Sequence, residues 1–188
     1  MIRILSPVAP LLFGVAILLT GQGLQGTLLP LRANIEGFST LSIGLMGGAY
    51  FFGFTLGCLR GSRFLRRVGH VRVFAAMTAA ASAVPLIHGL WMEAWLWWLL
   101  RFVTGYCFAV LYVVIESWLN ELSNNESRGA VFSAYTLITL TVLAVGQQML
   151  LLYDPKEMYL FAIASALVSL AAIPVVLSVG PSPAHTET

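Results

Sequence analysis

Apolar residues occur along this chain in six long stretches, and most polar residues lie in the short connections between them. A helix needs about 20 apolar residues to cross a hydrocarbon core about 30 Å thick. Membrane strands would show ~10-residue segments of alternating polarity, which this sequence does not have, and helices are the other backbone structure that lipid tolerates. The pattern therefore predicts an all-α membrane protein with six transmembrane helices, at residues 9–29, 41–59, 73–90, 96–119, 131–153 and 158–179.

The composition supports lipid as the main solvent of these helices. Hydrophobic residues make up 59% of the 188 residues and charged residues only 10%, whereas soluble domains carry about 25% charged residues. The first stretch exceeds the ~7–15 residues of a signal-peptide core and lacks a cleavage site, so we interpret it as a retained span. We expect one transmembrane bundle over residues 1–179, followed by a polar tail or interdomain linker at 180–188.

The positive charges indicate an orientation. If the spans alternate in direction, seven of the ten Lys and Arg residues fall on one side: Arg3, Arg60, Arg63, Arg66, Arg67, Arg72 and Arg128. Arg32 and Lys156 fall on the other side, and Arg101 lies within the fourth span. Because cytoplasmic loops are enriched in Lys and Arg, we predict that both termini are cytoplasmic, in what is most simply a bacterial inner membrane.

Several other kinds of site are not supported. The string Gly21–Gly26 reads G-x-G-x-x-G but lies within a span, whereas a dinucleotide site needs that string between a strand and a helix. Cys58 and Cys107 are 49 residues apart in apolar runs, and the histidines are scattered, so we expect no metal site and no cofactor. The sequence has no G-x-S-x-G serine and no D-x-x-D motif, and we predict that the protein is not an enzyme. A net charge of +2 gives no reason to expect nucleic acid as a partner.

Four polar side chains lie inside the predicted spans: Gln22, Gln25, Arg101 and Gln147. An arginine at the centre of a membrane helix costs about 2.5–3.5 kcal/mol on insertion scales, so such residues usually face a cavity or a partner. All four lie near the same end of their spans, which predicts one shared cavity bounded by the first, fourth and fifth spans. Two alternatives remain: Arg101 could extend to the headgroups, and the glutamines could simply bond neighbouring helices.

The second span carries glycines at four-residue spacing, at Gly53, Gly57 and Gly61. Small residues at this spacing let two helix backbones approach closely, so we predict a helix-packing face. The dense charge between the second and third spans predicts a loop that also contacts anionic headgroups.

Three motifs resemble the N-terminal half of the major facilitator superfamily. The second connection of that family carries G-x-x-x-D-[R/K]-x-G-[R/K]-[R/K]; here Arg66-Arg67-Val68-Gly69-His70 matches in part, with Ser62 at the first glycine and Arg66 at the aspartate. Arg101 and Gly105 match the fourth-span R-x-x-x-G. Glu121 and Arg128 match an E-x(6)-R spacing before the fifth helix.

The likeness covers about residues 11–179 and is greatest to a bacterial branch known as uncharacterised facilitator-type transporters. It implies a 3+3 inverted repeat and a coupling role for Arg101. It also implies that Gly105 packs helices, and that the second-span glycines meet the opposite half of the transporter. Finally, it implies a cytoplasmic gating loop made of Arg66, Arg67, Gly69, Arg72, Glu121 and Arg128.

The leading hypothesis is one half of a secondary active transporter that moves a small solute by alternating access, with protons as the candidate coupling ions. The alternative is a membrane scaffold or assembly subunit that keeps the fold without transport. Expected partners are membrane lipids, an unidentified solute and a second six-helix half, on the same polypeptide or on another subunit. The sequence does not identify the solute. Its one intramembrane cation, Arg101, favours an anionic or proton-linked solute.

Overall fold

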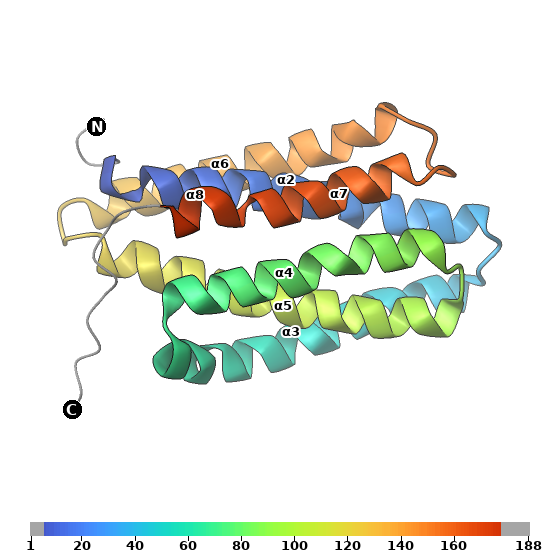
Figure 1. Cartoon of the computed structure of the whole chain (residues 1–188), viewed down its shortest axis with the longest axis horizontal. Helices are drawn as coiled ribbons and strands as arrows, with labels where there is room; N and C mark the ends of the chain where they lie inside the picture. The colour runs from blue at the N-terminus through green and yellow to red at the C-terminus, as the bar shows by residue number, and fades with distance from the viewer. Residues whose placement is uncertain (1–5, 178–188) are drawn as a thin grey trace.

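A computed structural model describes residues 6–177, and within this range every regular element is helical (Figure 1). The six long helical segments predicted from hydropathy are present, each apolar enough to cross a membrane. After a short 3-10 helix η1 (Ser6–Val8), the chain forms α2 (Ala9–Ile35), α3 (Thr40–Val68), α4 (His70–Leu90), α5 (Ala94–Glu121), α6 (Arg128–Gln148), η2 (Met149–Leu151), α7 (Tyr159–Leu170) and α8 (Ala172–Val176). The expected polar tail at 180–188 lies outside the described residues.

The region predicted as a charged loop between the second and third spans is helical, so that prediction was wrong. Helix α3 continues to Val68 and α4 begins at His70, with Gly69 as the whole connection. Gly69 has φ +89° and ψ 159°, a conformation essentially restricted to glycine, which lets one residue reverse the chain. Hydropathy marks where a helix leaves lipid and not where it ends, and arginine is a good helix former.

Proline positions explain one further boundary. Pro174 cannot donate to the carbonyl of Leu170, four residues earlier, and its ring clashes there, so the last span divides into α7 and α8. Together these two pieces cover one span, Tyr159–Val176. Pro30 and Pro85 lie inside α2 and α4, and both helices continue through them.

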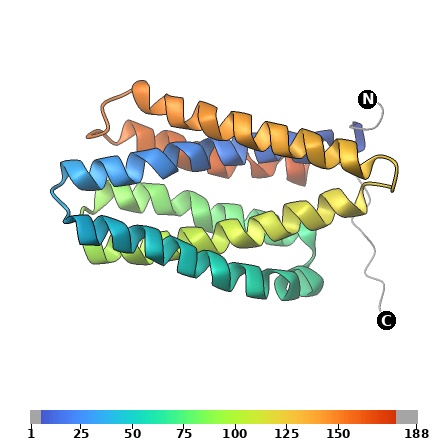
Figure 2. The ribbon, with the colours of Figure 1, turned by 180° about the vertical axis from the view of Figure 1, so that it is seen from behind.

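Successive long helices run in opposite directions along the length of the bundle, as Figures 1 and 2 show. Helix α3 packs mainly on α5, α2 on α6, and α4 on α7. Exchanging the first three spans (α2, α3, α4) for the last three (α5, α6, α7 with α8) converts the α2–α6 pair into α5–α3 and leaves α4–α7 unchanged. The packing therefore has the symmetry of a 3+3 inverted repeat, as the fold prediction required.

Glycines form the two equivalent helix crossings. At the α3–α5 crossing, a Cβ on Gly53 would overlap the carbonyl of Phe102, and a Cβ on Gly105 would overlap the carbonyl of Tyr50. Phe102 and Tyr50 each lie three residues before the glycine of their own helix. The α2–α6 crossing repeats this geometry with two other glycines: the pairs are Gly23 with Leu143 and Gly146 with Thr20.

The glycine face of the second span is therefore a packing face, but the expectation that it meets the opposite half was wrong. Gly53, Gly57 and Gly61 all face α5 of the same bundle; a Cβ at Gly57, for example, would lie 2.6 Å from the carbonyl oxygen of Tyr106. Nearer the start of α3, Gly44 and Gly48 have open space where a Cβ would be.

Two hydrophobic clusters divide the interior along the bundle axis. One contains α2 residues up to Leu19 and α5 residues from Cys107 onward. The other contains α2 residues from Leu24 onward together with Trp97 of α5. The polar residues Gln22 and Arg101 lie in the layer between the two clusters.

Candidate functional site

A cavity of about 240 Å³ opens at this layer, where four helices meet. Glycine contacts bring the helices together there: α5 approaches α3 at Gly105, and α6 approaches α2 at Gly146. The lining residues come from α2 (Gln22, Gly23, Gln25, Gly26), α3 (Tyr50, Phe51), α5 (Arg101, Thr104) and α6 (Leu143, Gln147). The layer predicted from the first, fourth and fifth spans thus also has a wall from the second.

All four predicted intramembrane polar residues line this one cavity: Gln22, Gln25, Arg101 and Gln147. The sequence argument placed the end of the first span at Leu29, whereas α2 continues to Ile35. Gln22 and Gln25 therefore lie near the middle of their helix and not near its end. The four side chains share one layer because the glycine crossings bring the helices together there. Their distances from the helix ends do not determine that layer.

Arg101 lies over the aromatic face of Tyr50. Its Cζ is 4.4 Å from the ring centroid, within the range of a cation–π contact. Arg101 is half-buried and lines the cavity. Among residues 6–177, Arg101 forms neither an ion pair nor a side-chain hydrogen bond; ion pairs join Arg32 to Glu36 and His70 to Glu121.

Gln22 joins three helices. Its Nε2 donates to the hydroxyl of Tyr50 (2.9 Å), and its Oε1 accepts from the hydroxyl of Tyr112 (2.8 Å). Both alternatives considered for this residue therefore apply, since Gln22 bonds neighbouring helices and also lines the cavity. The network fixes Tyr50 beneath Arg101 and leaves the Tyr50 hydroxyl hydrogen available.

Gln25 contrasts with Gln22. Its side chain is only 2% exposed, yet neither Nε2 nor Oε1 has a hydrogen-bond partner within the described part of the chain. Gln147 lines the cavity from the last turn of α6 and is exposed in this bundle. The cavity thus holds one unpaired cation and two amides with free hydrogen-bonding capacity.

Sequence reasoning did not find three polar residues of this layer. Tyr50 and Tyr112 carry the hydroxyls that hold Gln22, and Thr104 lines the wall while donating to the carbonyl of Leu100 (2.8 Å). One available signal for Tyr50 was its position three residues before Gly53, on the same helix face. His88, one of the histidines that are scattered along the sequence, is fully buried in α4, and its ring stacks edge-on against Trp97.

The residues predicted to form a gating loop gather at one end of the bundle, on helix ends and not on a loop. Arg66 and Arg67 lie in the last turn of α3, Arg72 in the first turn of α4, and Glu121 and Arg128 at the end of α5 and the start of α6. We refer to this end as the arginine-rich end. Arg128 and Glu121 form no ion pair with each other in residues 6–177.

A partner of Glu121 is instead His70, the first residue of α4. Its Nε2 lies 3.5 Å from the Glu121 carboxylate and 3.2 Å from the hydroxyl of Ser117, and its ring packs on Trp118. His70, which occupies a position where the family motif has a cation, therefore connects the start of α4 to the end of α5.

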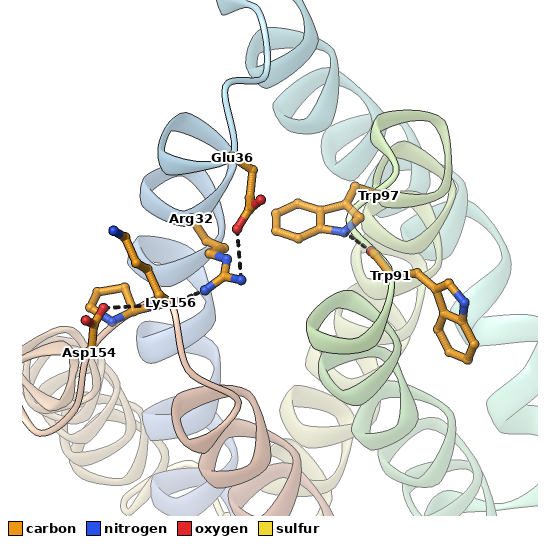
Figure 3. Close-up of polar contacts among 7 residues, drawn as sticks. Arg32, Glu36, Trp91, Trp97, Asp154 and Lys156 are labelled. Carbon is orange, nitrogen blue, oxygen red and sulfur yellow. Dashed lines mark hydrogen bonds and ion pairs between the residues drawn. The ribbon is translucent and has the colours of Figure 1, made fainter.

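At the far end of the bundle, Arg32 belongs to α2 and is buried, whereas the predicted bounds placed it beyond the end of the first span (Figure 3). Its guanidinium donates to the carbonyl of Pro155 (2.9 Å) and pairs with Glu36 (2.9 Å). In the same region, the indole of Trp97 donates to the carbonyl of Trp91 (2.7 Å). These contacts tie the end of α2 to the α6–α7 connection and the end of α4 to α5.

No group of three or more His, Cys, Asp or Glu side chains that could hold a metal ion occurs within the described range. The cavity chemistry is instead that of a polar binding layer inside an apolar six-helix bundle. The fold and this layer together define an integral membrane protein with the architecture of a transporter half.

Comparison with known proteins identifies the family. The model of the Major Facilitator Superfamily matches residues 11–188, so the chain belongs to this superfamily of transporters. An uncharacterised transporter of this type from Enterobacter sp. (strain 638) is 32% identical over 146 residues, which are 77% of this chain and 38% of that protein. No solved structure matches.

Two further relatives are the uncharacterised facilitator-type transporters named YcaD. The protein from Escherichia fergusonii is 29% identical over 174 residues, covering 92% of this chain and 45% of the relative. The protein from Escherichia coli (strain K12) is 32% identical over 144 residues, covering 76% of this chain and 37% of the relative. The chain thus spans less than half the length of the curated relatives that it matches.

Proposed function

We propose that this chain is one half of a secondary active transporter that moves a small solute by alternating access, with the cavity around Arg101 as its contribution to the solute pathway. The observation that carries the proposal is the unpaired guanidinium of Arg101 in a polar cavity between the two hydrophobic clusters of the bundle. A scaffold gains nothing from this arrangement, because an unpaired intramembrane cation costs insertion energy.

The geometry of the half supports the same proposal. In transporters built from repeats, solute sites lie near the midplane, where the repeats meet. Here the cavity lies between the two hydrophobic clusters and is lined by the first two spans of each repeat: α2 and α3, α5 and α6. A second six-helix half, on the same polypeptide or a separate subunit, would close the pathway.

Proton coupling, if this transporter uses it, would depend on Arg101 acting on an acidic group from elsewhere. Arginine stays protonated in proteins, and no Asp, Glu or His of the described residues lines the cavity. We further propose a bacterial inner-membrane location with the arginine-rich end in the cytoplasm, because six of the nine Lys and Arg residues in the described part of the chain lie toward that end.

Cysteine accessibility tests the proposal. Gln147→Cys, in a background lacking Cys58 and Cys107, is treated with an impermeant maleimide in intact cells and, separately, in inverted membrane vesicles. Alternating access predicts labelling from both sides, because the cavity opens to each in turn. Control cysteines at Arg63 and Tyr153, both exposed at opposite ends, should react from one side each. If Gln147→Cys reacts from one side only, or from neither, the transporter proposal is refuted and the alternative of a membrane scaffold is favoured.

A further inference from the structure

We infer, building on the proposed function, that the cavity binds a small organic monoanion with a carboxylate and a neighbouring hydrogen-bond donor, and that Gln25 recognises that donor. The inference rests on three features: the single charge of the cavity, the free hydrogen-bonding atoms that line it, and its size.

The charge of the cavity calls for one negative charge. Of the described residues that line the cavity, Arg101 alone carries a permanent charge. The cation–π contact with Tyr50 does not neutralise it, and no carboxylate of the described residues pairs with it. A planar guanidinium with five N–H donors matches a carboxylate, which it can hold through two parallel hydrogen bonds.

The amide of Gln25 specifies a second group. A buried amide without partners is costly, so such a group in a native structure needs an explanation. Both amide atoms of Gln25 are free and the side chain is 2% exposed in the cavity wall. Its Nε2 can donate to the anion, but its Oε1 can only accept, so the solute must supply an N–H or O–H.

No other lining group of the described residues donates to Oε1 of Gln25. Gln22 is bonded at both amide atoms, and the Thr104 hydroxyl donates to a backbone carbonyl. The groups available to bind a solute are therefore the side chains of Arg101, Gln25 and Gln147, together with the hydroxyl hydrogen of Tyr50. The cavity volume of about 240 Å³ corresponds to about eight waters at ~30 Å³ each, which suits a molecule of metabolite size.

An inorganic halide would match Arg101 equally well, but it would leave Oε1 of Gln25 without a donor. A neutral amide or alcohol would match Gln25 but leave the charge of Arg101 unmatched. These two ligand classes are therefore the alternatives that an experiment must separate from a hydroxy- or amino-carboxylate.

The test is binding to the purified full chain in lipid nanodiscs, measured by calorimetry and by the shift in thermal midpoint, with three probes of similar size. Lactate carries both a carboxylate and a hydroxyl, propionate lacks the hydroxyl, and lactamide lacks the charge. We expect lactate to bind, propionate to bind about tenfold more weakly, as the loss of a buried hydrogen bond predicts, and lactamide to give no measurable binding. Chloride should compete only weakly with lactate.

Variants assign the two roles. Gln25→Met keeps the shape of the side chain without the amide, so it should bring lactate and propionate to within about twofold of each other. Because it also removes an unpartnered buried amide, it should raise the thermal midpoint of the ligand-free protein. Arg101→Gln should abolish binding of both carboxylates. Gln148→Leu, at an exposed glutamine next to the cavity residue Gln147, is the matched control and should change neither affinity.

Several results would overturn the inference. Equal affinity for lactate and propionate in the wild type would show that the solute needs no hydrogen-bond donor and that Gln25 does not recognise one. Binding of lactamide as tightly as lactate would show that the site does not require a negative charge. Displacement of lactate by equimolar chloride would show that it does not require an organic anion. If none of the three probes binds while Gln147→Cys still reacts from both sides, the solute class is wrong and the transporter proposal stands. If lactate binds but Gln147→Cys is labelled from one side only, the proposed solute class is supported and the proposal of alternating access is refuted.

Discussion

Arg101 combines a position inside the bundle with a contact to an aromatic ring and no carboxylate partner among the described residues. Arg101→Lys keeps the charge but loses the planar five-donor fork, so in the complete transporter it should reduce uptake more than it reduces the amount of protein in the membrane. Arg101→Leu should abolish uptake and still insert, because removing an intramembrane charge favours insertion. Uptake and membrane-protein level are measured in the same cells. Normal uptake by Arg101→Leu would make this residue an interfacial anchor.

Gly69 is the residue whose backbone conformation is most restrictive. At φ +89° and ψ 159°, a side chain is strained whatever space surrounds it, and Gly69→Ala should lower the free energy of unfolding by about 1–3 kcal/mol. Gly129→Ala is the control, because Gly129 is helical and nothing lies within 4 Å of where its Cβ would be. Thermal unfolding followed by circular dichroism compares the two. Equal midpoints would mean that the α3–α4 connection relaxes to another conformation.

Individual site residues were predictable where their polarity was conspicuous in an apolar stretch. Gln22, Gln25, Arg101 and Gln147 were chosen for that reason, and the structure brings them to one cavity. Tyr50 could not be chosen in the same way, since tyrosine is common in membrane helices and its hydroxyl partner lies on another helix. The contrast between Gln22, bonded at both Nε2 and Oε1, and Gln25, without partners among the described residues, depends on three-dimensional neighbours that spacing along the chain does not encode.

Among the elements, the α3–α5 crossing depends on small residues from both helices. Gly53→Ala places a Cβ against the carbonyl of Phe102, and backbone atoms cannot move aside cheaply, so we expect a loss of about 1–3 kcal/mol in stability. Gly48→Ala, on the same helix with open space around it, should be neutral or slightly stabilising, since alanine is the better helix former. Both variants are compared by thermal unfolding of the purified chain.

The same experiment separates two interpretations of the glycine face. If the face holds this bundle together, Gly53→Ala lowers the stability of the isolated chain. If it met the opposite half, the chain alone would be unaffected and only association of the two halves would weaken. The structure favours the first result, and the equivalent crossing at Gly146, which faces the carbonyl of Thr20, should respond in the same way.

The existence of each membrane helix followed from hydropathy, because about 20 apolar residues in succession have few other stable structures. The helix ends did not follow, for a physical reason. Polar residues such as Arg66 continue a helix beyond the lipid, so α3 is longer than its apolar stretch. The pairing of helices also remained open, because the two symmetry-related crossings are visible only once Gly23 and Gly105 are seen to face equivalent carbonyls.

At the scale of the whole molecule, the positive charges are concentrated on helix ends at one side of the bundle. Arg63, Arg66, Arg67 and Arg72 are all exposed near the α3–α4 connection, and Arg128 is exposed at the start of α6. Retention of such side chains in the cytoplasm orients membrane proteins during insertion, and the effect is strongest for charges close to span ends. Because this distribution is set by helix ends and not by a flexible loop, these side chains emerge at fixed positions around the bundle.

The resulting prediction is that Arg63 and Arg128 face the cytoplasm and Lys156 faces the opposite side. Single cysteines at these positions, in a background lacking Cys58 and Cys107, are tested with an impermeant thiol reagent in intact cells. Lys156→Cys should react without disruption of the membrane, whereas Arg63→Cys and Arg128→Cys should react only in inverted vesicles or permeabilised cells. Arg32 is a poor reporter for the outer side, because it is 8% exposed and bonded to Pro155 and Glu36. Removing one arginine from a cluster of this size leaves the charge difference between the two sides largely intact, so each variant should keep the native orientation. Labelling of Arg63→Cys from outside intact cells would show that the orientation is the reverse of the one predicted here.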